Sequence, residues 1–157
     1  MDTDSALKTA ARLLQRWAQQ TATPEPDRLD VTLDAADLLQ AVAALQVSRW
    51  GYLAAITGVD LGPEAGEIEL LYHFCAGAAV VTLRVRTPRN QAFVPSICEV
   101  VPSASFYERE LMEMLGVTVA NTPNTDRLFL PDDWPQGVYP LRKDFRMDDA
   151  PLPRSEP

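Results

Sequence analysis

The sequence has few of the side chains that most often perform catalysis or bind metals, with one histidine and two cysteines among 157 residues. No Walker loop, HExxH motif or GxGxxG motif occurs in it. His73 and Cys75 lie two residues apart in the apolar segment LLYHFC, and Cys98 lies in a second apolar segment. A packed histidine and buried free thiols are favoured over the alternatives, a two-ligand metal site or a disulfide, because zinc sites normally use three or four protein ligands. Two cysteines also exclude an ordinary four-cysteine iron–sulfur cluster held by this chain alone.

The chain also lacks long apolar runs and an excess of basic residues. No segment approaches the roughly 20 apolar residues of a membrane-spanning helix, and the N-terminal segment MDTDSALKTAARLLQRWAQQ has no signal-peptide core. The 14 basic residues stand against 22 acidic ones, for a net charge of −8, which argues against non-specific binding to nucleic acid or anionic lipid. We therefore expect a soluble chain that stays where it is made, does not insert into a membrane, and reaches one only through a partner.

The apolar pattern predicts one α+β domain in which a small, mostly antiparallel sheet packs with helices. Helical spacing occurs over residues 6–20 and 34–45, and Asp34 is the expected cap of the second helix. Segments rich in β-branched and aromatic residues predict strands at 29–33, 47–60, 67–75 and 79–87. Ala-Gly-Ala joins the last two segments, so they are expected to form a hairpin.

Two further helices are expected after residue 93. Pro95 suits the first turn of a short helix in VPSICEVV, because its missing N–H costs nothing there. Ser105 and Glu108 have the spacing of a capping box that opens the helix FYERELMEML, and Gly116 is a natural residue to end it. The apolar stripe of this helix consists of Phe106 or Tyr107, Leu111, Met114 and Leu115, whereas Glu108, Arg109 and Glu113 lie largely off it.

The last part of the chain contains seven prolines between residues 120 and 157, so it cannot form a long helix or a central strand. We divide the chain into a core domain, residues 1–119, and an extended proline-rich C-terminal arm, residues 120–157, that is not an independent domain. Aromatic residues interleaved with arginine on such an arm have the composition of a protein interface. A tail packed on its own domain is an equal alternative.

The candidate docking residues lie in the helix before Gly116 and in the arm. Arg109 lies between two glutamates and suits a fixed ion-pair network. The acidic pairs Glu108/Glu110 and Asp132/Asp133 would suit an acid–base couple, but no pocket or substrate-binding motif accompanies them. The candidate docking residues are Glu108, Arg109, Glu110, Arg127, Asp133, Trp134, Tyr139, Arg142, Lys143, Asp144 and Phe145.

Three separate blocks resemble a known family signature: YERELMEMLGV (107–117), NTPNTDRLFLPDDW (121–134) and YPLRKDF (139–145). Their order and spacing are similar to the 30-kilodalton subunit of complex I. Bacterial NADH–quinone oxidoreductases contain this family, and energy-converting, membrane-bound nickel–iron hydrogenases share it. The resemblance covers residues 80–145. The chain departs from respiratory members at 121–123, where Asn-Thr-Pro replaces Gly-His-Pro, and in a longer link at 135–140. Both departures favour the hydrogenase-related branch or a bacterial variant close to it.

The resemblance implies a subunit without a redox centre or bound cofactor. In such complexes the iron–sulfur clusters, and the nickel–iron centre of the hydrogenase branch, belong to partner subunits. The signature segment is then expected to pack on the large subunit that helps form the quinone or nickel–iron site, beside the iron–sulfur subunits. The chain would lie at the cytoplasmic face of the cell membrane and be held there through these partners.

Overall fold

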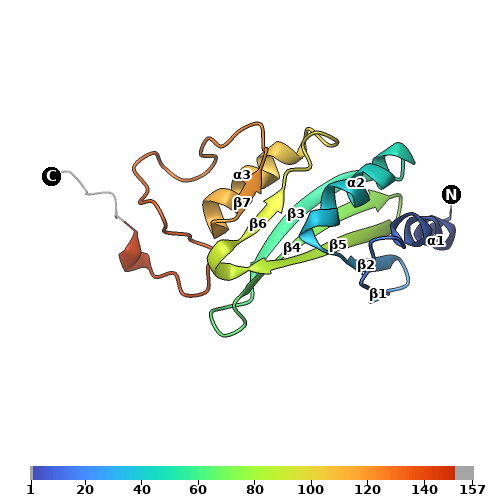
Figure 1. Cartoon of the computed structure of the whole chain (residues 1–157), viewed down its shortest axis with the longest axis horizontal. Helices are drawn as coiled ribbons and strands as arrows, with labels where there is room; N and C mark the ends of the chain where they lie inside the picture. The colour runs from blue at the N-terminus through green and yellow to red at the C-terminus, as the bar shows by residue number, and fades with distance from the viewer. Residues whose placement is uncertain (1, 151–157) are drawn as a thin grey trace.

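A five-stranded mixed sheet forms the centre of the fold in the computed structural model, which describes residues 2–150 (Figure 1). The strands lie in the order β1-β2-β5-β4-β3, and every neighbouring pair is antiparallel except β2 and β5. Their bounds are Gln20–Ala22 for β1, Arg28–Thr32 for β2, Tyr52–Asp60 for β3, Glu67–Ala76 for β4 and Ala79–Pro88 for β5. A second, two-stranded sheet pairs β6 (Phe93–Pro95) with β7 (Thr118–Ala120) in parallel. The predicted α+β class and the β4–β5 hairpin are confirmed.

Three α-helices accompany the sheets in the described residues. They are α1 (Thr3–Leu14), α2 (Leu38–Val47) and α3 (Ala104–Leu115), and the 3-10 turns are η1 (Ala35–Asp37), η2 (Arg89–Gln91) and η3 (Met147–Asp149). The predicted helix over 6–20 is too long, because the chain turns after Leu14 and enters β1 at Gln20. The predicted helix at 34–45 begins instead with η1, and the Asp34 side chain makes no capping hydrogen bond.

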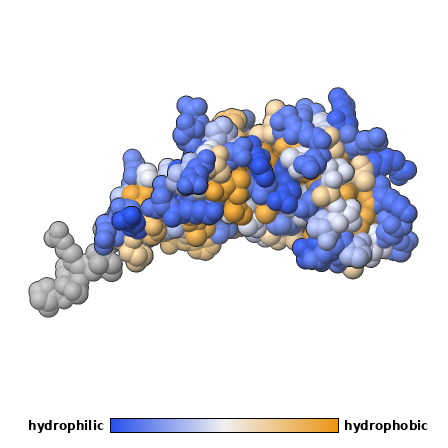
Figure 2. Space-filling view, turned by 90° about the horizontal axis from the view of Figure 1, so that it is seen from below, coloured by the Kyte–Doolittle hydropathy of each residue, from blue (hydrophilic) through white to orange (hydrophobic). Residues whose placement is uncertain are grey.

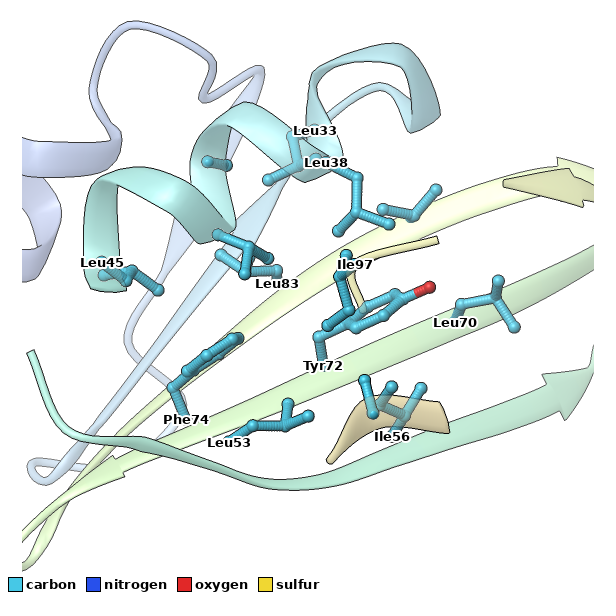
Figure 3. Packing of buried hydrophobic residues seen from close by; sticks show 14 of the residues in the cluster. Leu33, Leu38, Leu45, Leu53, Ile56, Leu70, Tyr72, Phe74, Leu83 and Ile97 are labelled. Carbon is cyan, nitrogen blue, oxygen red and sulfur yellow. The ribbon is translucent and has the colours of Figure 1, made fainter. Parts of the chain in front are cut away.

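The core lies between the sheet and the helices that cover one of its faces (Figure 3). Alternate residues of β4, including Tyr72 and Phe74, point into this core and are almost completely buried. His73 lies on the opposite face, where its Nδ1 is 3.1 Å from Thr82 Oγ1 in the adjacent strand. Burial lowers the pKa of His73. Cys75 is a half-buried free thiol on the same strand.

The expected helix in VPSICEVV is wrong. Residues Phe93–Pro95 form β6, and the pairing continues beyond it because Ser96 N donates to Ala120 O at 2.8 Å. This contact joins segments 24 positions apart, which local spacing does not reveal. The capping-box prediction is also wrong, since α3 begins at Ala104 and the cap residue, Ser103, makes no side-chain hydrogen bond. Gly116 ends α3 as predicted, in the left-handed conformation with φ of 70°.

The arm follows β7 without another strand in the described residues, and η3 is its last short turn. It lies at the opposite end of the molecule from α1 (Figure 1). Residues 151–157, the final part of the predicted arm, lie outside the described residues. The irregular backbone of the arm needs hydrogen-bond partners other than a sheet, and side chains of the core provide them.

Candidate functional site

Glu108 joins α3 to the turn after β6 inside the protein. Its carboxylate is 1% exposed and accepts hydrogen bonds from Ser96 Oγ at 2.8 Å, Ile97 N at 2.7 Å and Cys98 Sγ at 3.2 Å. Burial raises the pKa of the Cys98 thiol to about 11, and the nearby carboxylate acts in the same direction. The sequence pattern predicts Glu108 as a surface docking residue off the apolar stripe. The structure corrects this, since it is an internal residue that satisfies buried donors.

Arg109 and Glu113, one turn apart on α3, hold the first part of the arm. The Arg109 guanidinium donates to Asp126 O at 2.8 Å and to Arg127 O at 2.7 Å. The Glu113 carboxylate accepts hydrogen bonds from three consecutive backbone amides: Leu128 N at 3.3 Å, Phe129 N at 2.9 Å and Leu130 N at 2.8 Å. The positively charged Arg109 therefore binds backbone carbonyls, and the negatively charged Glu113 binds backbone amides. Both sets of contacts are charge-assisted hydrogen bonds.

Arg109 therefore binds backbone carbonyls, in place of the expected ion-pair network with neighbouring glutamates. Glu113 is not among the candidate docking residues, although it holds three amides of the arm. Its spacing of four residues from Arg109 places both side chains on one side of the helix. That spacing is the signal in the sequence that could have identified it.

Two side chains of the arm, those of Arg127 and Trp134, close the loop at residues 131–138. Arg127 donates to Pro131 O at 2.9 Å and to Trp134 O at 2.7 Å. The indole Nε1 of Trp134 donates to Val138 O at 2.9 Å, and its ring centroid lies 6.2 Å from that of Phe145. Trp134 and Phe145 are each half-buried. Trp134 and Phe145 thus pack against each other within the arm.

Tyr139 and Arg142 fix the arm at the C-terminal end of α3. The Tyr139 ring lies against Gly116, where a Cβ atom would overlap it. Arg142 Nε donates to Leu115 O at 2.8 Å, and its guanidinium lies 4.7 Å from the centroid of the Tyr139 ring. Leu141 N donates to the last turn of the helix as well. A cation therefore meets the carbonyls at the negative end of the helix.

Asp60, at the end of β3, binds the last part of the arm. Its carboxylate is 3% exposed and accepts from Arg89 Nε at 2.8 Å, Gly62 N at 3.0 Å and Lys143 N at 2.8 Å. Arg89 also pairs with Asp144 of the arm. Burial alone would raise the pKa of Asp60, but the hydrogen bonds from Arg89, Lys143 and Gly62 outweigh it and lower the pKa to about 2. We call Asp60, Arg89, the Lys143 amide and Asp144 the arm latch.

The surface built by α3 and the arm is partly hollow and partly apolar. A hollow of about 410 Å³ lies between them, lined by residues 134–138 of the loop and by Arg109 and Met112 of α3. Four large apolar side chains are more than half exposed on or beside this surface: Phe106, Phe129, Leu141 and Met147. Figure 2 shows apolar patches between polar side chains along one face of the molecule.

The remaining candidate docking residues differ in their surroundings. Asp133 and Lys143 have exposed side chains, whereas Glu110 is half-buried on α3. Glu108 and Glu110 do not act together, because the first points into the core and the second lines a groove at the surface. Contact of these residues with another chain stays a prediction.

Comparison with known proteins matches residues 31–151 to the respiratory-chain NADH dehydrogenase 30 Kd subunit family. The chain is 35% identical over 120 residues to an NADH-quinone oxidoreductase subunit of Moorella thermoacetica, covering 74% of this chain and 79% of that protein. It is 39% identical over 88 residues to the membrane-bound hydrogenase subunit beta of Pyrococcus furiosus, covering 54% and 50%. Other curated relatives are longer, and the chain spans between 24% and 61% of their length.

A solved structure shares the fold. A chain from the membrane-bound sulfane sulfur reductase, an archaeal respiratory membrane complex, has a TM-score of 0.77 and 26% identity, covering 91% of this chain and 86% of that one. No helix in residues 2–150 is long and apolar enough to cross a membrane. The matched residues include α3, the latch and the arm as far as residue 151, and they contain the three signature blocks. The chain belongs to the family of the respiratory-chain NADH dehydrogenase 30 Kd subunit.

Proposed function

We propose that the chain is a non-catalytic structural subunit in the hydrophilic arm of a complex I-type NADH–quinone oxidoreductase. In this role it supports electron transfer to quinone by neighbouring iron–sulfur subunits. It lies peripherally at the cytoplasmic face of the membrane and is held there by its partners. The large subunit that helps form the quinone site and the iron–sulfur subunits are the proposed partners.

The fixed arm is the observation that carries this proposal. Signature residues of α3 and the arm hold an irregular backbone in one shape, through Arg109, Glu113, Arg142 and the arm latch. The exposed apolar side chains, such as Phe129 at 63%, are thereby presented on an ordered surface. An ordered surface loses less conformational entropy when it binds, and exposed aromatic residues are efficient anchors in interfaces.

The thiols support a role without a bound cluster. Cys98 is buried beside Glu108, and Cys75 lies in β4 of the central sheet. No group of three or more His, Cys, Asp or Glu side chains in residues 2–150 could hold a metal ion. We propose that the iron–sulfur clusters of the complex belong to the partner subunits.

The equivalent subunit of an energy-converting, membrane-bound nickel–iron hydrogenase is the second candidate. Two observations favour it. The hydrogenase subunit of Pyrococcus furiosus shares 39% identity with this chain, and Asn121-Thr122-Pro123 departs from the Gly-His-Pro of respiratory members.

The test is a gentle affinity purification of the tagged chain from its own cells, with mass spectrometry and metal analysis. Iron with a quinone-site large subunit and no nickel supports the respiratory role. Iron with stoichiometric nickel supports the hydrogenase role. A lone monomer under mild detergent overturns both.

A pair of variants locates the docking surface in the same assay. Phe129→Asp introduces a charge on the arm, and Val47→Asp is the matched control, since Val47 is 85% exposed at the end of α2. We expect Phe129→Asp to lose the partners and Val47→Asp to keep them, with both chains folded by circular dichroism. Equal retention by the two variants contradicts docking through the arm.

A further inference from the structure

Strand β3 forms an open edge of the central sheet. Its only neighbour in the sheet is β4, so its other side carries unpaired backbone N–H and C=O groups within the described residues. Proteins often protect such edges with lysine, proline or a covering segment. The strand reads YLAAITGVD and has no charged residue or proline before Asp60.

The register identifies the groups that face the open edge. Leu61 N donates to Glu67 O at 3.0 Å just beyond β3, in the same register as most of the β3–β4 ladder. In an antiparallel pair, such bonded positions alternate with positions whose N–H and C=O point away. The odd-numbered residues from 55 onward therefore bond to β4. Ile56 and Gly58 direct their backbone groups to the open edge.

A groove of about 270 Å³ runs beside this edge, between residues 55–58 of β3 and the side of α3. At one end, Tyr107 Oη of α3 donates to Ala54 O at 2.9 Å. At the other end, Leu141 of the arm lines the groove, and its amide is bonded to Met114 O of α3. The groove thus combines free backbone groups with an apolar wall, which is the arrangement that binds an extended peptide by strand addition.

Glu110 is the ionisable carboxyl group that lines the groove. No hydrogen bond or ion pair reaches it from the described part of the chain, whereas its neighbours Arg109 and Glu113 are both bonded to the arm. The protein as a whole has a net charge of −8. A segment that carries a basic residue opposite Glu110 would therefore complement the groove best.

We infer that an extended, basic segment of a partner subunit pairs with β3 as a sixth strand in this groove. Its backbone bonds to Ile56 and Gly58, an apolar side chain packs on Met114 and Leu141, and a lysine or arginine meets Glu110. The inference rests on the proposed function, because the segment belongs to the same complex. A second copy of this chain is a poorer occupant, because it would bring another net charge of −8 to the edge.

Hydrogen exchange resolved to single residues tests the pairing. The isolated full-length chain is compared with the purified complex that contains it. We expect exchange of the Ile56 and Gly58 amides to slow by at least about 100-fold in the complex, as expected for newly bonded amides. The amides of Thr57 and Val59, which bond to β4, serve as the internal control and are protected in both samples.

Each outcome decides one point. Unchanged exchange at Ile56 and Gly58 in an assembled complex overturns the inference and leaves the proposed function standing. Protection that grows with the concentration of the isolated chain shows self-pairing and overturns the partner segment. A chain that assembles with nothing overturns the proposed function, and the inference with it.

Two charge-reversal variants test the proposed contact between Glu110 and a basic residue of the partner. Glu110→Lys is compared with Glu99→Lys, because Glu99 is exposed outside the groove. We expect Glu110→Lys to weaken retention of the partner roughly threefold, the size expected for a partly exposed ion pair, and Glu99→Lys to have no effect. Equal retention by both variants contradicts the basic residue opposite Glu110.

Discussion

Replacing Asp60 by Asn tests how strongly the arm latch holds the arm on the core. The buried carboxylate accepts from the Arg89 guanidinium and from the backbone amides of Gly62 and Lys143. An amide side chain keeps one acceptor oxygen, but its NH₂ group faces donors and it carries no charge. The substitution therefore removes the negative charge that binds Arg89, the Gly62 amide and the Lys143 amide of the arm.

The size of the effect follows from the pKa. Asp60 titrates at about 2 against an ordinary 3.8, and each pKa unit corresponds to about 1.4 kcal/mol. Ionised Asp60 thus contributes about 2 kcal/mol to the free energy of unfolding at neutral pH. For a chain of this length, that loss lowers Tm by roughly 4–8 °C.

Urea unfolding at several pH values measures this contribution and its sign. Because the folded pKa is lowered, the stabilisation is fully present above the unfolded pKa of 3.8 and is lost as pH falls toward 2. We expect Asp60→Asn to lose about 2 kcal/mol at pH 7 and much less near pH 2.5. Limited trypsin digestion reports the arm itself, since faster cleavage after Lys143 indicates release of the latch.

The matched control is Asp34→Asn, because Asp34 is exposed and makes no capping hydrogen bond. A loss below about 0.5 kcal/mol at pH 7 for Asp60→Asn, which is the range of ordinary surface substitutions, refutes the reasoning. A loss that is the same at pH 7 and pH 2.5 refutes it equally.

Three further substitutions test the packing of α3. Leu111→Ala should cost about 2–5 kcal/mol by thermal or urea unfolding, because Leu111 is 3% exposed in the core; unchanged stability would place it outside the core. Gly116→Ala should lower stability by at least about 1 kcal/mol, since φ is +70° and the added Cβ overlaps the Tyr139 ring; a neutral result would contradict that contact. Glu113→Gln should speed proteolysis within residues 126–130 while Tm falls little, because the amides lose a charged acceptor. Proteolysis as slow as in the native chain would show that the hydrogen bonds to these three amides do not require the negative charge.

Local patterns predict the elements that form from neighbouring residues. The β4–β5 hairpin follows from two apolar segments and a short turn, and Gly116 ends α3 because it tolerates a positive φ. The prediction of a helix after residue 93 is wrong. The pairing of this segment with β7 is set by residues about 25 positions later, so tertiary context overrides its local preference.

The docking residues show the same limit at the level of side chains. The sequence identifies Arg109, Arg127 and Arg142 as important but not their partners, which are backbone carbonyls of the arm and of α3. The positions of those carbonyls depend on the path of an irregular backbone, which residue spacing does not encode. The sequence pattern misplaces Glu108 because a carboxylate is rarely buried. Its burial is explained by three donors of the turn after β6: the Ser96 hydroxyl, the Ile97 amide and the Cys98 thiol.

The latch also orders events during synthesis of the chain. The Lys143 amide reaches Asp60 across 83 positions of sequence, so it can bond only after residue 143 has been synthesised and the sheet has brought β3 into place. Contacts between such distant positions form late in folding. We therefore expect the part of the arm around Lys143 to become ordered only after the central sheet has formed. If the chain docks through the arm as proposed, the latch makes that docking depend on a completely folded core.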